Sequence, residues 1–427
     1  MNQYASMIRS LKTPEVMERL LHLYGNRDGM LVEQTARYTS LLKRHEEYFH
    51  AEIPVLMVSA PGRTEIGGNH TDHNRGRVLA ASVNLDTLAA VSAREDMVVH
   101  VHSDGYPAMT IDLASLDKRP EEEGTTAALI RGVAARMAEL DYKIGGFDAV
   151  ITSTVASGSG LSSSAAFEVM TCAILDALYN GFGMDSKVRA KIGQYAENVY
   201  FGKPSGLLDQ MASAFGGLVT VDFRHDDPDV RPMSYDFARK GYALVVVGTG
   251  GSHDDLTDEY AAIPAEMKQV AAALGASVLR EIAPKDMERA IPQLKNKVSD
   301  RAILRALHFY DENERVDKLV AALEDGDITT FFEMLIASGE SSWKLLQNLY
   351  VAGSDNEEMP LALELSRRML EGCGAWRIHG GGFAGTILVF LPKDMVAEYT
   401  ERMNAVFGEG AVTPLMIRAD GAVQILY

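Results

Sequence analysis

The sequence predicts an α+β protein of two domains, and three observations lead to this prediction. The chain has 427 residues, 47% of them hydrophobic and 23% charged, which is enough to build more than one core. Apolar residues follow helical spacing at 14–50, and short β-branched runs begin at 53. The charged, proline-containing segment RHDDPDVRP at 224–232 separates two series of strands and helices, so we expect the chain to cross between domains there.

The first series runs from the helical segment at 14–50 to residue 223. Runs separated by Gly, Asn, Asp and Pro predict a mostly antiparallel sheet between 53 and 113. Then come a helix in TTAALIRGVAARMAEL, a strand in FDAVITSTV, and the loop SGSGLSSSAA, which leads into a long helix. The next helix, VRAKIGQYAENVYFG, ends at Gly202 and Pro204, and GLLDQMASAFGG and GLVTVDF predict a helix and a strand.

The second series begins with the strand YALVVVG at 242–248 and a helical block at about 256–349. A helix in LALELSRRMLEG, strands on either side of HGGGFAG, a further helix and a last strand ending in VQILY follow. The sequence has no fixed repeat and no segment of low complexity, so each series is expected to form an ordinary α+β domain.

Composition limits the classes of partner. Acidic residues number 59 against 41 basic ones, and the net charge of −18 opposes broad contact with nucleic acid or an anionic membrane. Cys172 and Cys373 form no CxxC pair and suggest neither a disulfide framework nor structural zinc. The N-terminus does not resemble a signal peptide, and no apolar run is long enough to span a bilayer. We therefore expect a cytoplasmic protein that binds a small molecule.

The loop SGSGLSSSAA at 157–166 is the strongest local sign of a ligand. Small residues let backbone N–H groups surround an anion, and the helix that follows presents its positive dipole end to it. The loop lacks the Gly-Lys-Ser/Thr ending of the common NTPase loop and the GxGxxG of the dinucleotide fold. The loop therefore predicts a phosphate site of another kind, with a serine-capped flexible linker as the alternative.

Two acidic residues and one serine hydroxyl lie where they could bind a metal or face a ligand. Ser164 at the helix start and Glu197 on the next helix offer the hard oxygen ligands that Mg²⁺ takes beside a phosphate. Asp209 follows the turn KPSGLL, where a helix start can hold a carboxylate that faces a cleft. The alternatives are a solvated helical glutamate and a helix-capping aspartate.

Glycine and histidine clusters are less specific. HGGGFAG at 379–385 indicates close approach by a ligand or by another backbone, with a tight hairpin as the alternative. His70 with His73, and His100 with His102, have spacings that could place each pair on one face. The sequence offers no third ligand with metal spacing near either pair, so we do not expect a histidine metal site.

Three patterns stand in order along the chain: APGRTEIGGNHTDHNRG at 60–76, SGSGLSSSAA at 157–166 and GAWRIHGGGFAG at 374–385. Together they resemble the three signatures of the GHMP small-molecule kinases, and the first is similar to the galactokinase version. Further segments at 196–210 and 308–342 and the last strand also resemble galactokinases, so the resemblance covers nearly the whole chain. It implies the two-domain GHMP kinase fold, with domains at 1–224 and 225–427 and the active site in the cleft between them.

The resemblance implies an ATP-dependent kinase of the anomeric hydroxyl of a hexose, galactose first. Asp209 matches the base, and Arg63 matches the arginine beside the base and the transferring phosphoryl group. The other implied roles are nucleotide binding by Gly158, Ser159, Gly160, Leu161, Ser162, Ser163, Ser164, Gly381 and Gly382, Mg²⁺ binding by Ser164 and Glu197, and sugar binding by Asn69, His70, Asp72, Gly206 and Tyr260. We expect Mg²⁺ as cofactor, ATP as co-substrate, and a monomer.

Asn69 departs from the family pattern, because galactokinases usually carry Glu-His-Thr-Asp-Tyr where this chain has Asn-His-Thr-Asp-His. The family glutamate accepts hydrogen bonds from the sugar, whereas an amide is neutral and donates as well. Two kinds of substrate are consistent with the change: galactose held by altered contacts, or a derivative such as galacturonate or a sugar modified at the 2 or 6 position. A non-catalytic sugar and ATP sensor is the alternative of another class, although a sensor has no need of a base such as Asp209.

Overall fold

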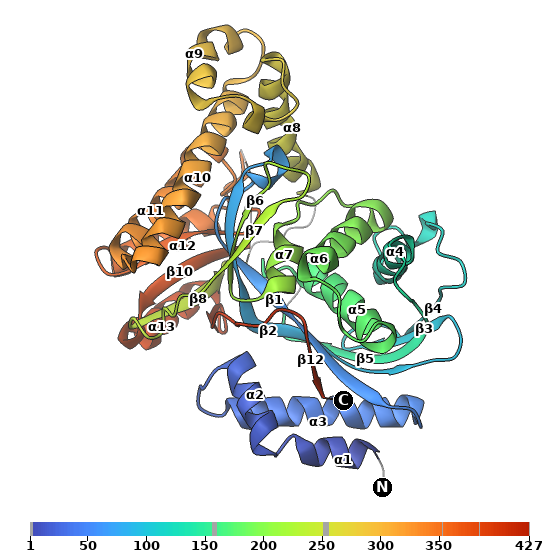
Figure 1. Cartoon of the computed structure of the whole chain (residues 1–427). Helices are drawn as coiled ribbons and strands as arrows, with labels where there is room; N and C mark the ends of the chain where they lie inside the picture. The colour runs from blue at the N-terminus through green and yellow to red at the C-terminus, as the bar shows by residue number, and fades with distance from the viewer. Residues whose placement is uncertain (1–2, 156–159, 251–255, 352, 384, 427) are drawn as a thin grey trace.

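The computed structural model describes residues 3–155, 160–250, 256–351, 353–383 and 385–426, and it contains two β-sheets with helices packed around them (Figure 1). The first sheet has eight strands in the order β12-β1-β2-β5-β3-β4, with β6 paired to β2 and β7 to β6. Its pairs are antiparallel, as predicted, except for β3 with β5. Its strands are β1 (Val55–Gly67), β2 (Arg77–Ala93), β3 (Val98–Ser103), β4 (Met109–Asp112), β5 (Phe147–Ser153), β6 (Leu218–Asp222), β7 (Asp229–Met233) and β12 (Val423–Leu426).

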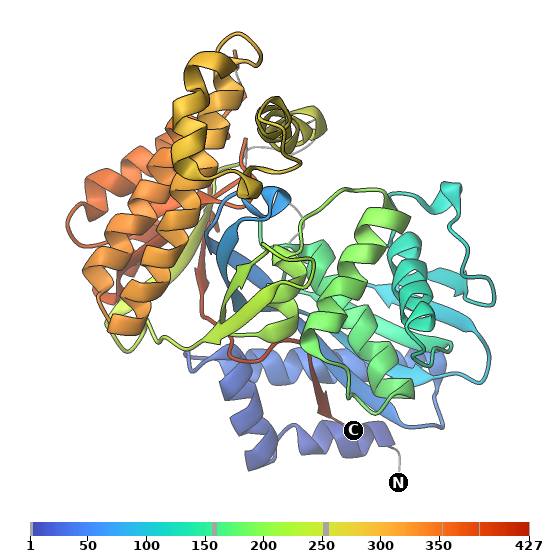
Figure 2. The same ribbon diagram turned by 45° about the horizontal axis from the view of Figure 1, so that its top comes forward.

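Helices cover both faces of this sheet (Figures 1 and 2). Alternation along β1 explains why, since Met57 belongs to the core under the N-terminal helices and its neighbour Val58 to the core on the opposite face. The N-terminal layer consists of α1 (Gln3–Ser10), α2 (Pro14–Tyr24) and α3 (Met30–Phe49). The opposite layer consists of α4 (Thr126–Glu139), α5 (Ser163–Tyr179), α6 (Ser186–Tyr195), the π-helix η3 (Ala196–Phe201) and α7 (Leu208–Phe215), and the short 3₁₀ turns are η1 (Asp72–Asn74) and η2 (Pro120–Glu122).

The second sheet has four antiparallel strands in the order β11-β8-β10-β9. They are β8 (Tyr242–Gly248), β9 (Ala375–His379), β10 (Thr386–Pro392) and β11 (Val412–Leu415). The helices of this half are α8 (Thr257–Ala273), η4 (Leu279–Glu281), α9 (Pro284–Leu294), α10 (Asp300–Asp325), α11 (Ile328–Ser341), the π-helix η5 (Ser342–Leu346), α12 (Glu358–Leu370), η6 (Lys393–Met395) and α13 (Val396–Phe407). α8 and α9 form the upper end of the molecule in Figure 1.

Local signals set several of these boundaries. Thr125, Asp185, Ser299 and Asp327 each cap a helix with a side-chain oxygen that accepts a backbone N–H. Gly202 ends the π-helix in a left-handed conformation, with φ of 86°, as its place in the sequence predicts. The loop between this helix end and α7 contains Ser205 and Gly206.

The two halves share one core. Ile66 and Leu79 from the first sheet, Leu244 and Phe390 from the second, and Val316 on α10 belong to a single buried cluster. The predicted division at 224/225 stays a prediction, but the sheets do not divide there: β7 and β12, which lie C-terminal to it, both pair in the first sheet. The joint between the sheets is therefore a continuous packed region, with long strands β1 and β2 passing through it.

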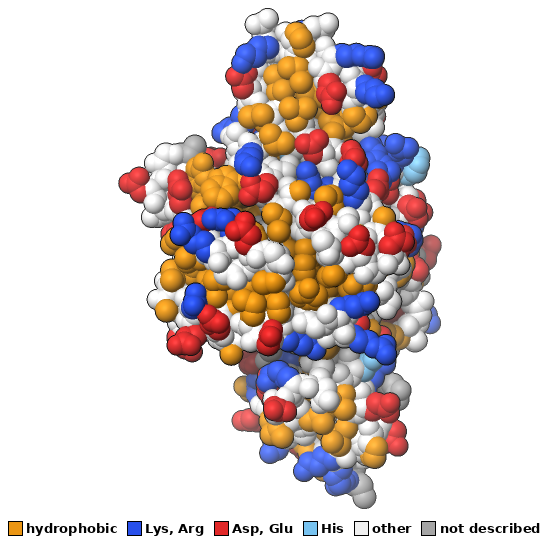
Figure 3. Space-filling view, turned by 90° about the vertical axis from the view of Figure 1, so that its left-hand side faces the viewer, with side chains coloured by type: hydrophobic (Ala, Val, Ile, Leu, Met, Phe, Trp, Pro, Cys, Tyr) orange, Lys and Arg blue, Asp and Glu red, His pale blue; other side chains and the backbone are white. Residues whose placement is uncertain are grey.

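The outer surface is mixed in character. Acidic and basic side chains are interspersed over the face shown in Figure 3, with hydrophobic side chains between them. Within the described ranges, no helix is long and apolar enough to cross a membrane.

Candidate active site

The centre of the site is an ion pair between Arg63 on β1 and Asp209 in the first turn of α7. Arg63 Nε donates to Asp209 Oδ1 at 2.6 Å and Nη2 donates to Oδ2 at 3.0 Å, so the contact is bidentate. The Arg63 side chain is 7% exposed, whereas that of Asp209 is 32% exposed. The carboxylate is thus the member of the pair that a ligand can reach.

The pKa of Asp209 lies below its ordinary value. Removal from water raises the pKa, but the charge of Arg63 and the hydrogen bonds from Arg63 and Ser162 lower it by more. The Ser162 hydroxyl donates to Asp209 Oδ2. Asp209 is therefore ionised at neutral pH and ready to accept a hydrogen bond or a proton.

The predicted phosphate loop lies directly against this pair. Gly158 and Ser159 fall outside the described residues, but Gly160 accepts a hydrogen bond from Arg63 Nη1 through its carbonyl oxygen, and Leu161 O accepts one from the Arg63 backbone at 3.0 Å. A Cβ on Gly62 would lie 2.9 Å from Leu161 O, so only glycine allows this approach. Ser163 and Ser164 begin α5, and the N-terminus of that helix points its positive dipole end toward the loop.

A second carboxylate stands beside the start of α5. Ser164 Oγ donates to Glu197 Oε1 at 3.1 Å, and Lys203 Nζ lies 3.4 Å from the same oxygen. Ser205 and Gln210 hold the other oxygen, Oε2, at 2.6 and 2.9 Å. No group of three His, Cys, Asp or Glu side chains suited to a metal occurs in the described part of the chain. A hydroxyl and a carboxylate fit a cation such as Mg²⁺, which completes its shell with water and phosphate oxygens.

Asp72 faces the loop that precedes α7. Its carboxylate lies so close to Gly206 that a Cβ there would be 1.6 Å from Asp72 Oδ2. With a larger residue at 206, the Asp72 side chain or one of the two loops, η1 and the loop that leads to Asp209, would have to move. This contact brings two of the predicted sugar-binding residues together.

The glycine turn after β9 holds His70 and Tyr260. His70 has a left-handed backbone, with φ of 57°, and its Nε2 bonds to Gly381 O at 2.8 Å. Tyr260 on α8 donates to Gly382 O at 2.7 Å, and a Cβ on Gly381 would meet its ring at 2.7 Å. Burial lowers the pKa of His70 to about 4 and raises that of Tyr260 to about 12, so both are neutral at physiological pH. Gly381 and Gly382 thus contact His70 and Tyr260, two residues predicted for the sugar.

Comparison with known proteins identifies the family. The galactokinase galactose-binding signature matches residues 43–93, and the N-terminal domain of the GHMP kinases matches residues 128–217. A galactokinase of Streptomyces coelicolor is 33% identical over 368 residues, which are 86% of this chain and 92% of that one. A galactokinase of Thermotoga petrophila is 30% identical over 82% of this chain and 93% of that one. The chain belongs to the galactokinase family. It is therefore a sugar kinase, as its motifs predict.

Solved structures confirm the predicted GHMP kinase fold. A Lactococcus lactis galactokinase, crystallised with galactose, aligns with a TM-score of 0.80 at 24% identity and covers 91% of this chain and 99% of that one. The mevalonate kinase of Methanococcus jannaschii aligns with a TM-score of 0.60 at 14% identity, covering 86% and 99%. The α+β arrangement is thus shared with galactokinase and with a kinase of a different small molecule.

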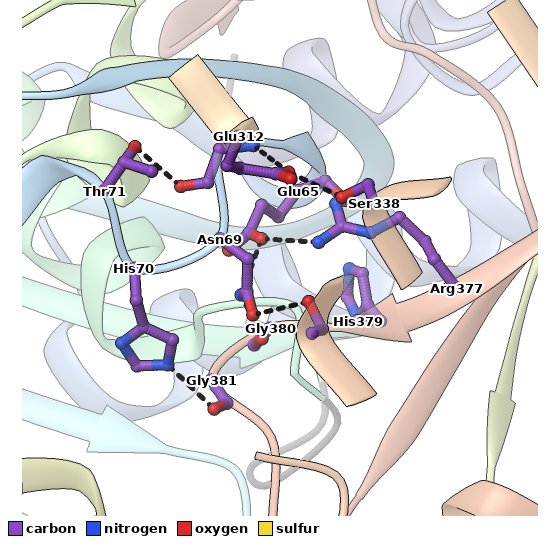
Figure 4. A network of polar contacts seen from close by, with 12 residues as sticks. Glu65, Asn69, His70, Thr71, Glu312, Ser338, Arg377, His379, Gly380 and Gly381 are labelled. Atoms are coloured by element: carbon purple, nitrogen blue, oxygen red, sulfur yellow. Dashed lines mark hydrogen bonds and ion pairs between the residues drawn. The ribbon is translucent and has the colours of Figure 1, made fainter. Parts of the chain in front are cut away.

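Asn69, the departure from the galactokinase pattern, lies inside the joint between the two halves (Figure 4). It is fully buried. Its Nδ2 donates to Glu65 Oε1 at 2.8 Å and to Gly380 O at 2.9 Å, and its Oδ1 accepts from Asn348 Nδ2 at 2.9 Å and Ser342 Oγ at 3.3 Å. The amide thus meets partners from β1, from the glycine turn and from the segment around η5.

Sequence reasoning brought together most of these residues but missed several partners. Arg63 with Asp209, Ser164 with Glu197, and Asp72 with Gly206 are neighbours in the structure, as the family resemblance implies. Lys203 and Glu65 were not singled out. Strand alternation offered a signal for Glu65, because it stands two residues after Arg63 in β1 and so shares its face.

Proposed function

We propose that this protein transfers the γ-phosphoryl group of ATP to the anomeric hydroxyl of galactose, giving galactose 1-phosphate and ADP. Asp209 accepts the proton of that hydroxyl, and Arg63 orients Asp209 and stabilises the transferring group. The observation that carries the proposal is the bidentate Arg63–Asp209 pair, set beside Gly160 and the start of α5 in a chain of the galactokinase family.

The ionised state of Asp209 suits this role. Phosphoryl transfer passes through a loose transition state with little bonding to the nucleophile, so a base of modest strength is sufficient. Alignment of two bound reactants can account for about 7 to 11 kcal/mol of the barrier. The fixed Arg63 guanidinium adds a positive charge where charge develops on the phosphoryl oxygens, an effect worth about 10³ or more in rate for arginines that act in this way.

The nucleotide phosphates bind at the N-terminus of α5, where Ser162, Ser163 and Ser164 offer hydroxyl and backbone donors. Ser164 and Glu197 would hold Mg²⁺, since together they supply the hard oxygen donors that the ion prefers. When bound, Mg²⁺ neutralises charge on the phosphate oxygens. Ser205 and Gln210 fix the orientation of Glu197 by holding its second oxygen.

His70, Asp72, Gly206 and Tyr260 form the sugar side of the site. Asp72 is an acceptor for sugar hydroxyls, and neutral His70 keeps its contact with the glycine turn that also carries Tyr260. Galactose is favoured over an acidic derivative, because the Asn69 amide is fully occupied by protein partners and leaves no position for a substrate carboxylate.

The test is ADP release in the presence of ATP and Mg²⁺ with galactose, galacturonate, 2-deoxygalactose, glucose and mevalonate as separate acceptors. We expect turnover with galactose to exceed that with galacturonate and with glucose. Turnover with galacturonate but not with galactose would mean that galacturonate is the substrate. Binding of galactose and ATP without ADP release would instead support a sensor.

A further inference from the structure

Asn69 has no free hydrogen-bonding group to offer a ligand. An asparagine side chain has two N–H donors and one carbonyl oxygen with two lone pairs. Here the two donors face Glu65 Oε1 and Gly380 O, and the oxygen accepts from Asn348 and Ser342. The backbone oxygen of Asn69 also accepts from His308 Nε2 at 3.0 Å. The residue is fully enclosed, so its contacts are made with the protein.

Glu65, which lies on β1 four residues before Asn69, has one carboxylate oxygen that no described residue uses. Its Oε1 accepts from Asn69 Nδ2 at 2.8 Å and from Arg377 Nη2 at 3.1 Å. Its Oε2 accepts no hydrogen bond within the described part of the chain. This oxygen is also not among the fully buried unpaired atoms of the described residues, so it keeps some contact with solvent. The side chain keeps 7% exposure. The accessible part of this carboxylate therefore includes the oxygen that the protein leaves unused.

Glu65 points to the same side of β1 as Arg63. The two residues are paired with Ala80 and Ser82 of β2 without a bulge between them, so strand alternation sets both side chains on one face. The Arg63 guanidinium is the partner of Asp209 on that face. Glu65 therefore lies on the face of β1 that also carries the Arg63 partner of Asp209.

We propose that Glu65 binds the substrate, accepting a hydrogen bond from a hydroxyl of the sugar through Oε2, and that Asn69 is a positioning residue for this carboxylate. The carboxylate acceptor that galactokinases usually carry at the position of Asn69 is, in this chain, supplied from the position of Glu65. The inference rests on the proposed function, because it concerns the sugar of that same site.

The chemistry of the pair explains why residue 69 is an amide here. A carboxylate at 69 would face both Glu65 and the carbonyl oxygen of Gly380, which are acceptors, so it would be repelled by each. An amide donates to both. Burial raises the pKa of Glu65, and the charges of Arg377, fully buried on β9, and of Arg63 oppose this rise.

The experiment compares galactose with 2-, 3-, 4- and 6-deoxygalactose as acceptors for the wild-type enzyme and for Glu65→Gln. The glutamine keeps an acceptor for Asn69 but removes the charge. Wild type is expected to discriminate strongly against the deoxy sugar that lacks the hydroxyl bound by Glu65. In Glu65→Gln the ratio of kcat/KM for galactose to that for this one sugar should fall by about tenfold or more, because a charge-assisted hydrogen bond is lost for galactose only.

Glu312→Gln is the matched control. Glu312 is another buried carboxylate of the same joint, and it accepts from the backbone N–H of Gly68 at 3.0 Å and from Ser338 at 2.5 Å. Its substitution perturbs the joint without touching the sugar, so the discrimination ratios should stay within about twofold of wild type. Unchanged ratios for all four deoxy sugars in Glu65→Gln, or an equal fall in Glu312→Gln, would overturn the inference.

A second measurement does not depend on the folding of a variant. A crystal structure of the wild-type protein with galactose should place a sugar hydroxyl within about 3.2 Å of Glu65 Oε2. A sugar bound at Asp209 without a hydroxyl at that distance would overturn the role of Glu65 and leave the proposed function intact. Failure of the wild type to phosphorylate galactose in solution would remove the proposed function itself.

Discussion

Asp209 carries the most direct prediction at the scale of single residues. Asp209→Asn keeps the size of the side chain but removes the proposed base, and we expect kcat to fall by about 10³. The fold should persist, since 32% of the native side chain is exposed and the amide still accepts from Arg63. ADP release gives the rate, and far-UV circular dichroism checks the fold.

The surface variant Asp227→Asn is the control for this experiment. Asp227 pairs with Lys187 and Lys191 and is largely exposed, so the activity of the Asp227→Asn enzyme should match that of wild type. A folded Asp209→Asn protein with near-normal turnover would contradict the proposed mechanism.

How far single residues could be predicted depends on whether a motif fixes them. Arg63 and Asp209 lie 146 positions apart, yet their place in two family patterns was enough to predict that they meet. Glu65 and Arg377, 312 positions apart, lie inside the first and the third pattern, but neither pattern implies a role for them. A glutamate in a strand does not indicate which buried arginine of another sheet will face it, so this pair appears only in the structure.

At the scale of elements, the contact between η1 and the loop before α7 predicts a specific sensitivity. Gly206→Ala would place a Cβ at 1.6 Å from Asp72 Oδ2, so the Asp72 carboxylate or one of the two loops must move. Because this contact belongs to the proposed sugar side of the site, we expect KM for galactose to rise about tenfold or more, since a misplacement of about 1 Å can cost catalysis about 10²-fold. Steady-state kinetics with galactose and ATP varied separately will measure it, and KM for ATP should change less.

Gly183→Ala is a suitable control, since its nearest neighbour is Asn180 O at 3.9 Å from the added Cβ. Its kinetics should be those of wild type. A Gly206→Ala enzyme with an unchanged KM for galactose would show that the approach of the two loops has no part in sugar binding.

Mild acid should destabilise the protein through His45 in the N-terminal helical layer. This α3 residue is fully buried, and its ring bonds to the Tyr4 hydroxyl of α1 at 2.9 Å and to Asp148 O of β5 at 3.3 Å. Burial lowers the pKa of His45 to about 4 from an ordinary 6.5. The unfolded chain therefore takes up a proton below pH 6.5 that the folded protein excludes until about pH 4.

Stability should accordingly fall as pH drops through this window. We expect His45 to account for about 2 kcal/mol of the loss between pH 7.5 and pH 5. Urea unfolding of wild type and His45→Gln at both values will measure it, because the other histidines are common to the two proteins. An equal loss in the two proteins would contradict the role of His45.

The predictability of the elements varied with their length. The strands expected between 53 and 113 correspond to β1–β4, and the helix after the phosphate loop is α5. β7 was not predicted at all, because most of it lies in the segment 224–232 that was expected to be the crossing between domains, and the partner of β12 was not predicted either. These strands have five and four residues, and in such short strands the choice of partner depends on tertiary packing more than on local pattern.

At the scale of the whole molecule, Asp86 links distant parts of the chain. It is fully buried on β2, and its carboxylate accepts from Tyr24 of α2 at 2.5 Å, from Arg37 of α3 at 2.6 Å, from Ser59 of β1, and from Arg418 near the C-terminus at 3.3 Å. Burial raises the pKa of Asp86, but the two arginines lower it by more. The net shift of the pKa is therefore downward, and the carboxylate stays charged.

Asp86→Asn should therefore destabilise the whole protein. It leaves the fully buried Arg418 and the nearly buried Arg37 without their counter-charge, and removal of one partner from a buried ion pair costs about 3–5 kcal/mol. Because the two halves share one core, we expect a single cooperative transition that shifts as a unit. Urea unfolding followed by far-UV circular dichroism and by the fluorescence of Trp343 and Trp376 tests both points, since the two tryptophans lie in η5 and β9, far along the chain from Asp86.

The exposed pair of Arg75 and Asp226 provides the contrast, because Asp226→Asn should change the free energy of unfolding by no more than about 0.5 kcal/mol. Coincident transitions at lower urea in Asp86→Asn would mean that the N-terminal layer, the C-terminal strand and the second sheet unfold together. A shift seen by circular dichroism but absent from the tryptophan signal would mean that the two halves unfold separately, and the shared core would then be too weak to couple them. The same measurement should be repeated with galactose present, because a ligand at 100 times its Kd adds about 2.7 kcal/mol to the stability of the folded state.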